Sequence, residues 1–202
     1  DITYLSTLPN FIVMAASDEA ELVKMINTST EINDKPCAFR YPRGSGLGST
    51  LPSINEKIEI GKSRIVLEGK KLAILNFGAR LSETMKAAEN LKKKGIGITI
   101  VDARFAKPLD ENLIWQLATN HEAIMTIEEG SIGGFGSHVV DFLSKKGLMD
   151  DNLKFRSMTL PDIFIDQDTP KNMYKIANLD CDSIEEKVLD TLNSNIVLQK
   201  HK

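Results

Sequence analysis

The feature that most limits the possible folds is a regular alternation of apolar segments and amphipathic segments from residue 71 onward. K-L-A-I-L-N-F-G (71–78) and I-G-I-T-I-V-D-A-R (96–104) have the length of buried strands, and residues 81–95 between them have helical spacing and end on a glycine. A helix of this length between two strands is the β-α-β signal, which predicts right-handed crossovers and parallel strands. We expect further helices at 110–120, 136–146 and 183–192, and further strands at 123–127 and 154–160. The fold class is therefore α/β, with a mainly parallel sheet and flanking helices.

The first fifty residues have a different organisation. An apolar strand at 11–14 is followed by a helix that begins after Asp18, with Glu21 at capping-box spacing, and then by a strand at 37–41. These elements are too few for a free-standing domain, so we interpret 1–52 as the last elements of a second α/β domain. Glycine, serine and proline crowd residues 42–53, which indicates a domain boundary at 44–56. We therefore predict a linker at 53–65 and a separate domain at 66–202. We expect 66–202 to fold autonomously and the N-terminal segment to be held loosely.

Composition and charge exclude several classes of partner. The chain has 25 Lys and Arg against 28 Asp and Glu, which leaves no basic surplus for nucleic acid. Its apolar runs are far shorter than a membrane span, so we expect no membrane insertion. Cys37 and Cys181 lie far apart, which predicts reduced thiols and a cytoplasmic protein. The chain opens D-I-T-Y-L-S, without Met or an apolar leader, and we interpret it as a piece of a longer protein.

A glycine-rich turn between strand and helix is the first candidate site. T-I-E-E-G-S-I-G-G-F-G-S-H (126–138) has the context in which backbone amides hold phosphates. Its glycines do not match G-x-G-x-x-G, and Glu128 and Glu129 stand directly before it, where they would repel pyrophosphate. We therefore favour close backbone packing here, at a subunit contact or within the fold, over cofactor binding.

R-Y-P-R-G (40–44) is the most informative motif on chemical grounds. Arg40 and Arg43 end a short strand beside a glycine-rich turn, and a guanidinium fork next to open amides suits a phosphate or carboxylate. The alternative is an ion pair that braces a domain boundary. The three histidines, His121, His138 and His201, lack the spacing of a metal or acid-base site, so we predict no catalytic, metal-binding or cofactor-binding residue in this chain.

Several motifs together resemble a known family. The 1-deoxy-D-xylulose-5-phosphate synthases are thiamine-diphosphate enzymes of the transketolase superfamily, and the resemblance covers nearly the whole chain. The motifs that carry it are R-Y-P-R-G, L-A-I-L-N-F-G (72–78), V-D-A-R-F-A-K-P-L-D (101–110), T-I-E-E-G-S-I-G-G-F-G-S (126–137) and L-P-D-I-F-I-D-Q-D-T (160–169). Transketolases and the β-subunits of 2-oxoacid dehydrogenases share the K-P-L-D and glycine-rich elements in looser form.

The resemblance implies a cytoplasmic homodimeric transferase. Such an enzyme condenses pyruvate with glyceraldehyde 3-phosphate, releasing CO2, for isoprenoid, thiamine and pyridoxal biosynthesis. Residues 1–52 match the end of the pyrimidine-binding middle domain, and 66–202 match the C-terminal domain. The family holds thiamine diphosphate and Mg²⁺ with residues that this sequence lacks, so we expect the chain alone to bind neither and to be inactive. Of the family's substrate contacts, Arg43 matches the arginine that binds the phosphate group of glyceraldehyde 3-phosphate.

Two alternatives remain open. The chain could belong to another thiamine-diphosphate enzyme, a transketolase or a dehydrogenase β-subunit, which would keep the fold and change the acceptor. It could instead be a free-standing interaction or regulatory module. One departure from the family concerns Asp168, which stands where a glycine is usual, so the local turn can differ.

Overall fold

The computed structural model describes residues 1–198, with the surroundings of side chains described through residue 193. A five-stranded sheet has the order β3-β5-β4-β7-β8, and a three-stranded sheet has the order β2-β1-β6. Within the larger sheet β4, β5, β7 and β8 run parallel, while β3 pairs antiparallel with β5. The strands are β1 (Ile12–Ala15), β2 (Cys37–Arg40), β3 (Arg64–Leu67), β4 (Leu72–Phe77), β5 (Thr99–Asp102), β6 (Phe105–Lys107), β7 (Ala123–Glu128) and β8 (Lys154–Met158).

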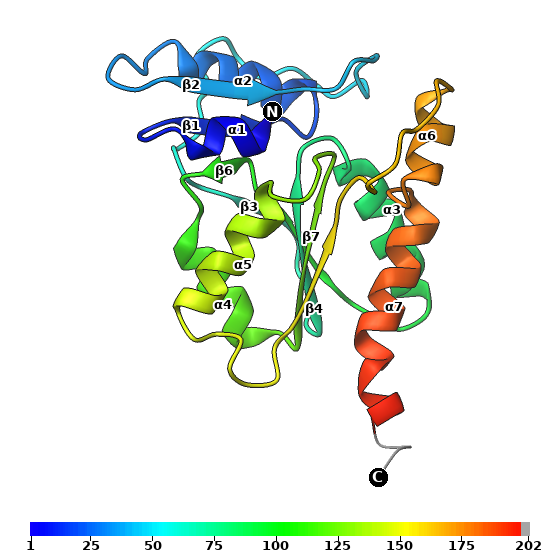
Figure 1. Cartoon of the computed structure of the whole chain (residues 1–202). Coiled ribbons are helices and arrows are strands. Elements are labelled where there is room, and N and C mark those ends of the chain that lie inside the picture. The colour runs from blue at the N-terminus through cyan, green and yellow to red at the C-terminus, as the bar shows by residue number, and fades with distance from the viewer. Residues whose placement is uncertain (199–202) are drawn as a thin grey trace.

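Helices cover both faces of the larger sheet (Figure 1). They are α1 (Ile2–Thr7), α2 (Glu19–Ser29), α3 (Leu81–Lys93), α4 (Glu111–Asn120), α5 (Phe135–Lys145), α6 (Pro170–Ile176) and α7 (Cys181–Leu198). The period-2 alternation of a strand decides which helices it contacts. In β4, Leu72 and Ile74 join the core under α3 and α7, whereas Leu75 and Phe77 join the core under α4 and α5. The predicted α/β fold with a mainly parallel sheet is confirmed.

Local signals explain how the helices begin and end. Asp18 caps α2, because its carboxylate accepts a hydrogen bond from the amide of Glu21 at 2.8 Å. Gly95 follows the end of α3 with φ +77°, the left-handed conformation in which glycine is favoured. Asp110 caps α4 by accepting from Leu113 N, and its second oxygen accepts from Ser63 N at 2.9 Å. No helix in residues 1–198 combines the length and apolarity that crossing a bilayer requires.

The N-terminal segment, which we expect to be held loosely, pairs and packs with the rest of the chain. Strand β6 lies in the second half of the chain, yet it pairs antiparallel with β1 and completes the small sheet. Ile2 and Val13 are buried in the same core as Phe77. Figure 1 shows this N-terminal layer lying across one end of the larger sheet. The predicted domain limits at 52 and 66 stay a prediction, although β3 already begins at Arg64.

A buried ionic network also ties the two parts together. Glu21, 1% exposed, accepts from the guanidinium of Arg104 at 2.7 and 3.0 Å and contacts Arg64 at 3.3 Å. Asp102, fully buried, accepts from Ser17 at 2.7 Å and from Arg64 at 3.1 Å. Glu21 and Ser17 come from the N-terminal segment, and the other three residues come from the larger sheet or its edge. The network therefore joins the two segments at their shared surface.

Candidate functional site

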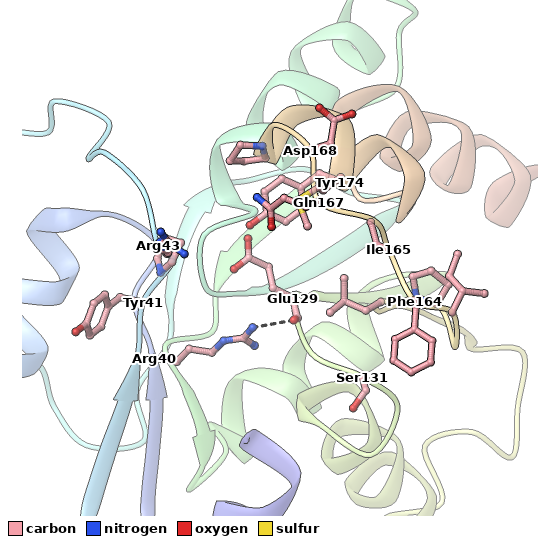
Figure 2. A pocket seen from close by; sticks show the side chains of 16 residues that line it. Arg40, Tyr41, Arg43, Glu129, Ser131, Phe164, Ile165, Gln167, Asp168 and Tyr174 are labelled. Carbon is pink, nitrogen blue, oxygen red and sulfur yellow. Dashed lines mark hydrogen bonds between the residues drawn. The ribbon is translucent and has the colours of Figure 1, made fainter.

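A cleft of about 710 Å³ opens where chain segments leave strands β2, β7 and β8. The loops at the carboxyl ends of parallel strands are the usual place for ligands in an α/β fold. Figure 2 shows Arg40, Tyr41 and Arg43 on one wall, Glu129 and Ser131 beside them, and the segment through Ile165, Gln167 and Tyr174 opposite. A second cleft of about 360 Å³ adjoins it and shares Tyr41, Pro42, Arg43, Pro170 and Tyr174. Residues 41–43 therefore form the ridge between two hollows.

Arg40 braces the two parts of the chain. Its Nη2 donates to the backbone carbonyl oxygen of Glu129 at 2.8 Å, and its Nε lies 3.6 Å from the carboxylate of Asp1. The side chain is half-buried, and Figure 2 shows its bond to Glu129 as a dashed line. Arg40 therefore matches the alternative of a bracing contact at the boundary between the two parts of the chain.

Arg43 has a different environment. It is exposed and lines both clefts, and among residues 1–198 it makes neither a hydrogen bond nor an ion pair. Pro42 precedes it and fixes the backbone direction of the ridge. A guanidinium with all its donors free at the rim of a cleft is available to an anionic ligand.

Beside Arg43 lies a group of three side chains, Arg80, Glu129 and Tyr174, in which the positive and the negative charge are paired. Arg80, at the start of α3, donates to the Glu129 carboxylate at 2.9 Å and lies 3.4 Å from the ring centroid of Tyr174. Burial and the neighbouring Glu129 carboxylate raise the pKa of Tyr174 to about 12, so its hydroxyl stays protonated at neutral pH. Arg80 and Glu129 neutralise each other, which leaves Arg43 as the unpaired charge on this wall.

The glycine-rich turn holds an anion that belongs to the protein. The Glu128 carboxylate accepts from Phe135 N at 3.0 Å and from Gly136 N at 2.8 Å, so it caps the first turn of α5. A Cβ on Gly134 would lie 2.3 Å from Glu128 Oε2, and one on Gly136 would lie 2.6 Å from Thr126 Oγ1. Close packing within the fold explains these glycines. Burial raises the pKa of Glu128, and the two amide donors oppose that shift. A diphosphate at the start of α5 would have to displace the Glu128 carboxylate from the amides of Phe135 and Gly136.

The remaining titratable candidates have packing roles. His121 contacts Thr99 Oγ1 at 2.8 Å and the Leu117 carbonyl oxygen at 3.0 Å. His138 is half-buried on α5, and His201 lies outside the described residues. Within residues 1–198 there is no group of three or more His, Cys, Asp or Glu that could hold a metal ion. Both cysteines are free thiols.

The departure at Asp168 is accommodated locally. Its carboxylate accepts from Thr169 N at 2.6 Å and from the side-chain amide of Asn172 at 3.0 Å. Thr169 then caps α6 by accepting from Asn172 N at 3.4 Å. Asp168 therefore supports the start of the helix that carries Tyr174.

Sequence reasoning selected Arg43 and missed Arg80, Glu129 and Tyr174 as parts of the same site. The rule that ligands bind at the carboxyl ends of strands would have found Arg80 and Glu129, since Glu129 directly follows β7 and Arg80 lies in the short turn between β4 and α3. Tyr174 lies on a short helix without a sequence signal of its own.

Comparison with known proteins identifies the family of this chain and solved structures that are similar to it. The family described as "Transketolase, C-terminal domain" matches residues 61–184. A solved structure described as a split gene transketolase, inactive beta4 tetramer, shares 25% identity at a TM-score of 0.81, covering 95% of this chain and 61% of that one. Transketolase from Campylobacter jejuni subsp. jejuni NCTC 11168 shares the fold at a TM-score of 0.65 and 14% identity, over 93% of this chain and 27% of that one. The chain spans less than two thirds of either protein's length.

Proposed function

The chain belongs to the transketolase C-terminal domain family, and from this premise we propose that it forms the acceptor-binding part of a thiamine-diphosphate enzyme, a 1-deoxy-D-xylulose-5-phosphate synthase. The enzyme removes CO2 from pyruvate and joins the remaining two carbons to the aldehyde carbon of glyceraldehyde 3-phosphate. The observation that carries the proposal is the exposed, unpaired guanidinium of Arg43 between two clefts. We assign to Arg43 the phosphate group of the acceptor.

The geometry of a guanidinium and a phosphate supports this assignment. A phosphate dianion offers oxygens at the spacing of a guanidinium fork, so two parallel charged hydrogen bonds can form. The Arg40 guanidinium is held by Glu129 and Asp1. The Arg43 guanidinium has no such partner in the part of the chain that the structure describes, and it can turn toward the ligand. Tyr41 and Pro42 direct the ridge without adding charge. Binding the phosphate here would orient the aldehyde end of the acceptor away from the ridge.

Thiamine diphosphate supplies the carbanion chemistry of such an enzyme when it is bound. In this chain the Glu128 carboxylate already occupies the amides of Phe135 and Gly136 at the start of α5. The share of the reaction that we assign to these residues is therefore to bind and orient the acceptor. We further propose a cytoplasmic homodimer as the working form, with the cofactor and Mg²⁺ held by residues outside this sequence.

A transketolase is the second candidate, and the 25% identity to a split gene transketolase favours it. Both enzymes would use the same fold, and they differ in the donor. R-Y-P-R-G together with L-P-D-I-F-I favours the synthase. Release of CO2 from labelled pyruvate by the intact enzyme separates the two, because only the synthase requires decarboxylation.

The test of the site uses Arg43→Ala in the intact enzyme that contains this chain. Charged hydrogen bonds of this kind contribute ~1.5 to 3 kcal/mol, so use of glyceraldehyde 3-phosphate should fall about 10-fold to 150-fold. Arg43→Lys restores the charge without the planar fork and should recover only part of the loss. Steady-state kinetics with unphosphorylated glyceraldehyde should change little, and so should the KM for pyruvate.

The matched control is Lys92→Ala, which removes an exposed cation from α3, away from the ridge. It should behave like the unaltered enzyme with both acceptors. Equal losses with the phosphorylated and unphosphorylated acceptor in Arg43→Ala, accompanied by a lower melting temperature, would mean that Arg43 is structural.

A further inference from the structure

The segment directly after Arg43 is wrapped around a carboxylate from a distant helix. Glu19, the first residue of α2, accepts hydrogen bonds from three successive backbone amides: Leu47 N at 3.0 Å, Gly48 N at 2.5 Å and Ser49 N at 2.8 Å. One carboxylate oxygen takes the amides of Gly48 and Ser49, and the other takes Leu47. We call residues 44–49 with the Glu19 carboxylate the Glu19 clasp.

The glycines of the clasp are explained by this contact. A Cβ on Gly46 would lie 2.8 Å from Glu19 Cδ, so a larger residue would push the carboxylate away from its present position. Gly48 has φ +83°, a conformation that L side chains rarely adopt. The stretch whose glycines suggested a domain boundary is therefore a binding loop for an internal anion.

Glu19 is a fixed point and not a mobile side chain at a loop tip. It follows the capping residue Asp18, and the next turn of α2 buries Glu21 in the ionic network and Met25 in the core. Its own backbone amide, followed by the amide donors of the clasp, lowers the pKa of Glu19, so the carboxylate stays ionised at neutral pH.

Arg43 thus lies between two anchors. Upstream, β2 pairs with β1 as far as Arg40, whose carbonyl oxygen accepts from Ala16 N at 3.0 Å and whose guanidinium bonds to the Glu129 carbonyl. Downstream, the clasp holds the chain from Leu47 onward. Tyr41, Pro42 and Arg43 span the interval between them, and Pro42 removes part of its freedom.

We infer that Glu19 is a positioning residue for Arg43: by holding residues 44–49, it keeps the ridge between the two clefts and so sets the preference for a phosphorylated acceptor. The inference rests on the proposed function of Arg43. Glu19 acts through the backbone, because its carboxylate oxygens accept hydrogen bonds from the amides of Leu47, Gly48 and Ser49.

Two variants test the clasp. Glu19→Ala removes all three acceptors. Glu19→Gln keeps an oxygen for Gly48 and Ser49 but turns an amide group toward the N–H of Leu47, so its effect should be smaller. Glu89→Ala is the matched control, since Glu89 is exposed on α3.

The first measurement uses the chain itself and does not depend on the proposed function. Trypsin cleaves after Arg43, and the rate of that cut, followed by mass spectrometry, reports release of residues 44–49. Losing charged hydrogen bonds at a partly exposed site should raise the rate roughly 3-fold to 10-fold in Glu19→Ala. Glu89→Ala should leave it unchanged. An unchanged rate in Glu19→Ala would overturn the clasp as an anchor.

The second measurement uses the intact enzyme. The KM for glyceraldehyde 3-phosphate should rise about 3-fold to 10-fold in Glu19→Ala, with the KM for pyruvate and the activity on unphosphorylated glyceraldehyde preserved. The double variant Glu19→Ala with Arg43→Ala should be no worse than Arg43→Ala alone, since both changes act on one contact. A general structural defect would instead add to the Arg43 loss.

The outcomes separate the two proposals. If Arg43→Ala raises the KM for the phosphorylated acceptor and Glu19→Ala does not, the positioning role is wrong and the proposed function stands. If neither variant raises that KM, the assignment of Arg43 fails, and the positioning role fails with it even where trypsin shows a loosened clasp.

Discussion

The strongest stability prediction concerns Arg104, which lies in the connection between β5 and β6. Its guanidinium makes two hydrogen bonds to the Glu21 carboxylate, which is 1% exposed. Arg104 is itself held at φ +59°, an unusual conformation for a residue with a side chain. Alanine at this position keeps the same backbone penalty, so Arg104→Ala measures the loss of the ion pair.

The magnitude follows from what remains around Glu21. Removing one partner of a buried ion pair costs about 3 to 5 kcal/mol, because the other charge is left buried and unpaired. Here Arg64 still approaches Glu21 at 3.3 Å, and Lys24 lies at 3.4 Å. Because these two cations still compensate part of the Glu21 charge, the expected loss in the free energy of unfolding lies at or below the lower limit of that range, at about 2 to 3 kcal/mol. Arg104→Lys keeps the positive charge but loses the two parallel hydrogen bonds to Glu21. Its free energy of unfolding should therefore lie between that of the unaltered chain and that of Arg104→Ala.

Urea unfolding at pH 7 is the assay, with the far-UV signal as one probe and hydrogen exchange of β1 and α2 as the other. Arg156→Ala is the control, because the Arg156 guanidinium donates to the carbonyl oxygen of its neighbour Phe155. Exchange should accelerate first in residues 12–29, since the network joins this segment to the larger sheet. A loss in Arg104→Ala within about 0.5 kcal/mol of the control would refute the reasoning, since ordinary surface substitutions stay in that range.

Two further predictions concern packing and pH. Gly134→Ala should lower the free energy of unfolding by ~1 to 3 kcal/mol, because its Cβ would collide with the Glu128 carboxylate, whereas Gly97→Ala, which meets nothing within 4 Å, should stay within about 0.5 kcal/mol in the same urea titration. Burial lowers the pKa of His138 below its usual 6.5, with smaller opposed effects of Asp141 and Lys107, so the unfolded chain binds the proton more readily. Stability from this group is complete above pH 6.5 and is lost as the pH falls toward the lowered value; the urea midpoint should therefore drop more between pH 7.5 and 5.5 in the unaltered chain than in His138→Gln, and equal drops would contradict it.

The parallel sheet was predictable because its signal is local. Strands such as β4 and β7 are buried along their whole length, so each is a continuous apolar run, and the helices between them carry recognisable caps. Strands β3 and β6 were not predictable in the same way. They are short, and β6 exists as a strand because it pairs with β1, which lies far away in the sequence. Long-range pairing of that kind leaves no periodic pattern.

The case of Glu21 shows how a local signal can conceal a distant one. Its spacing from Asp18 fits a capping box, and one half of that motif is present, since Asp18 accepts from the amide of Glu21. The Glu21 side chain turns instead to Arg104, 83 residues away in the sequence. The ion pairs of the buried Glu21 carboxylate with two arginines take the place of the second capping hydrogen bond. Only the tertiary structure brings those arginines near Glu21.

The candidate site was predictable in kind but not in its division of roles. R-Y-P-R-G indicated an anion site or a bracing ion pair, and the structure gives the bracing contact to Arg40 and an open environment to Arg43. Which arginine takes which role depends on where Glu129 lies, and that is set by the pairing of β7 in the larger sheet. The sequence alone does not show which arginine lies near Glu129.

Two glycine-dense turns in this chain hold carboxylates of the chain itself, Glu128 in one and Glu19 in the other. Exposed amides attract any anion, and a carboxylate tethered nearby is always present at high effective concentration. Glu128 stands beside its turn in the sequence, so its role as the bound anion could be suspected from the same feature that argued against pyrophosphate. Glu19 precedes its turn by a helix and a strand, so only the fold brings the two together. Glu128 and Glu19 thus occupy the amides of Phe135, Gly136, Leu47, Gly48 and Ser49, and the free guanidinium of Arg43 is the group that we propose for the acceptor phosphate at this ridge.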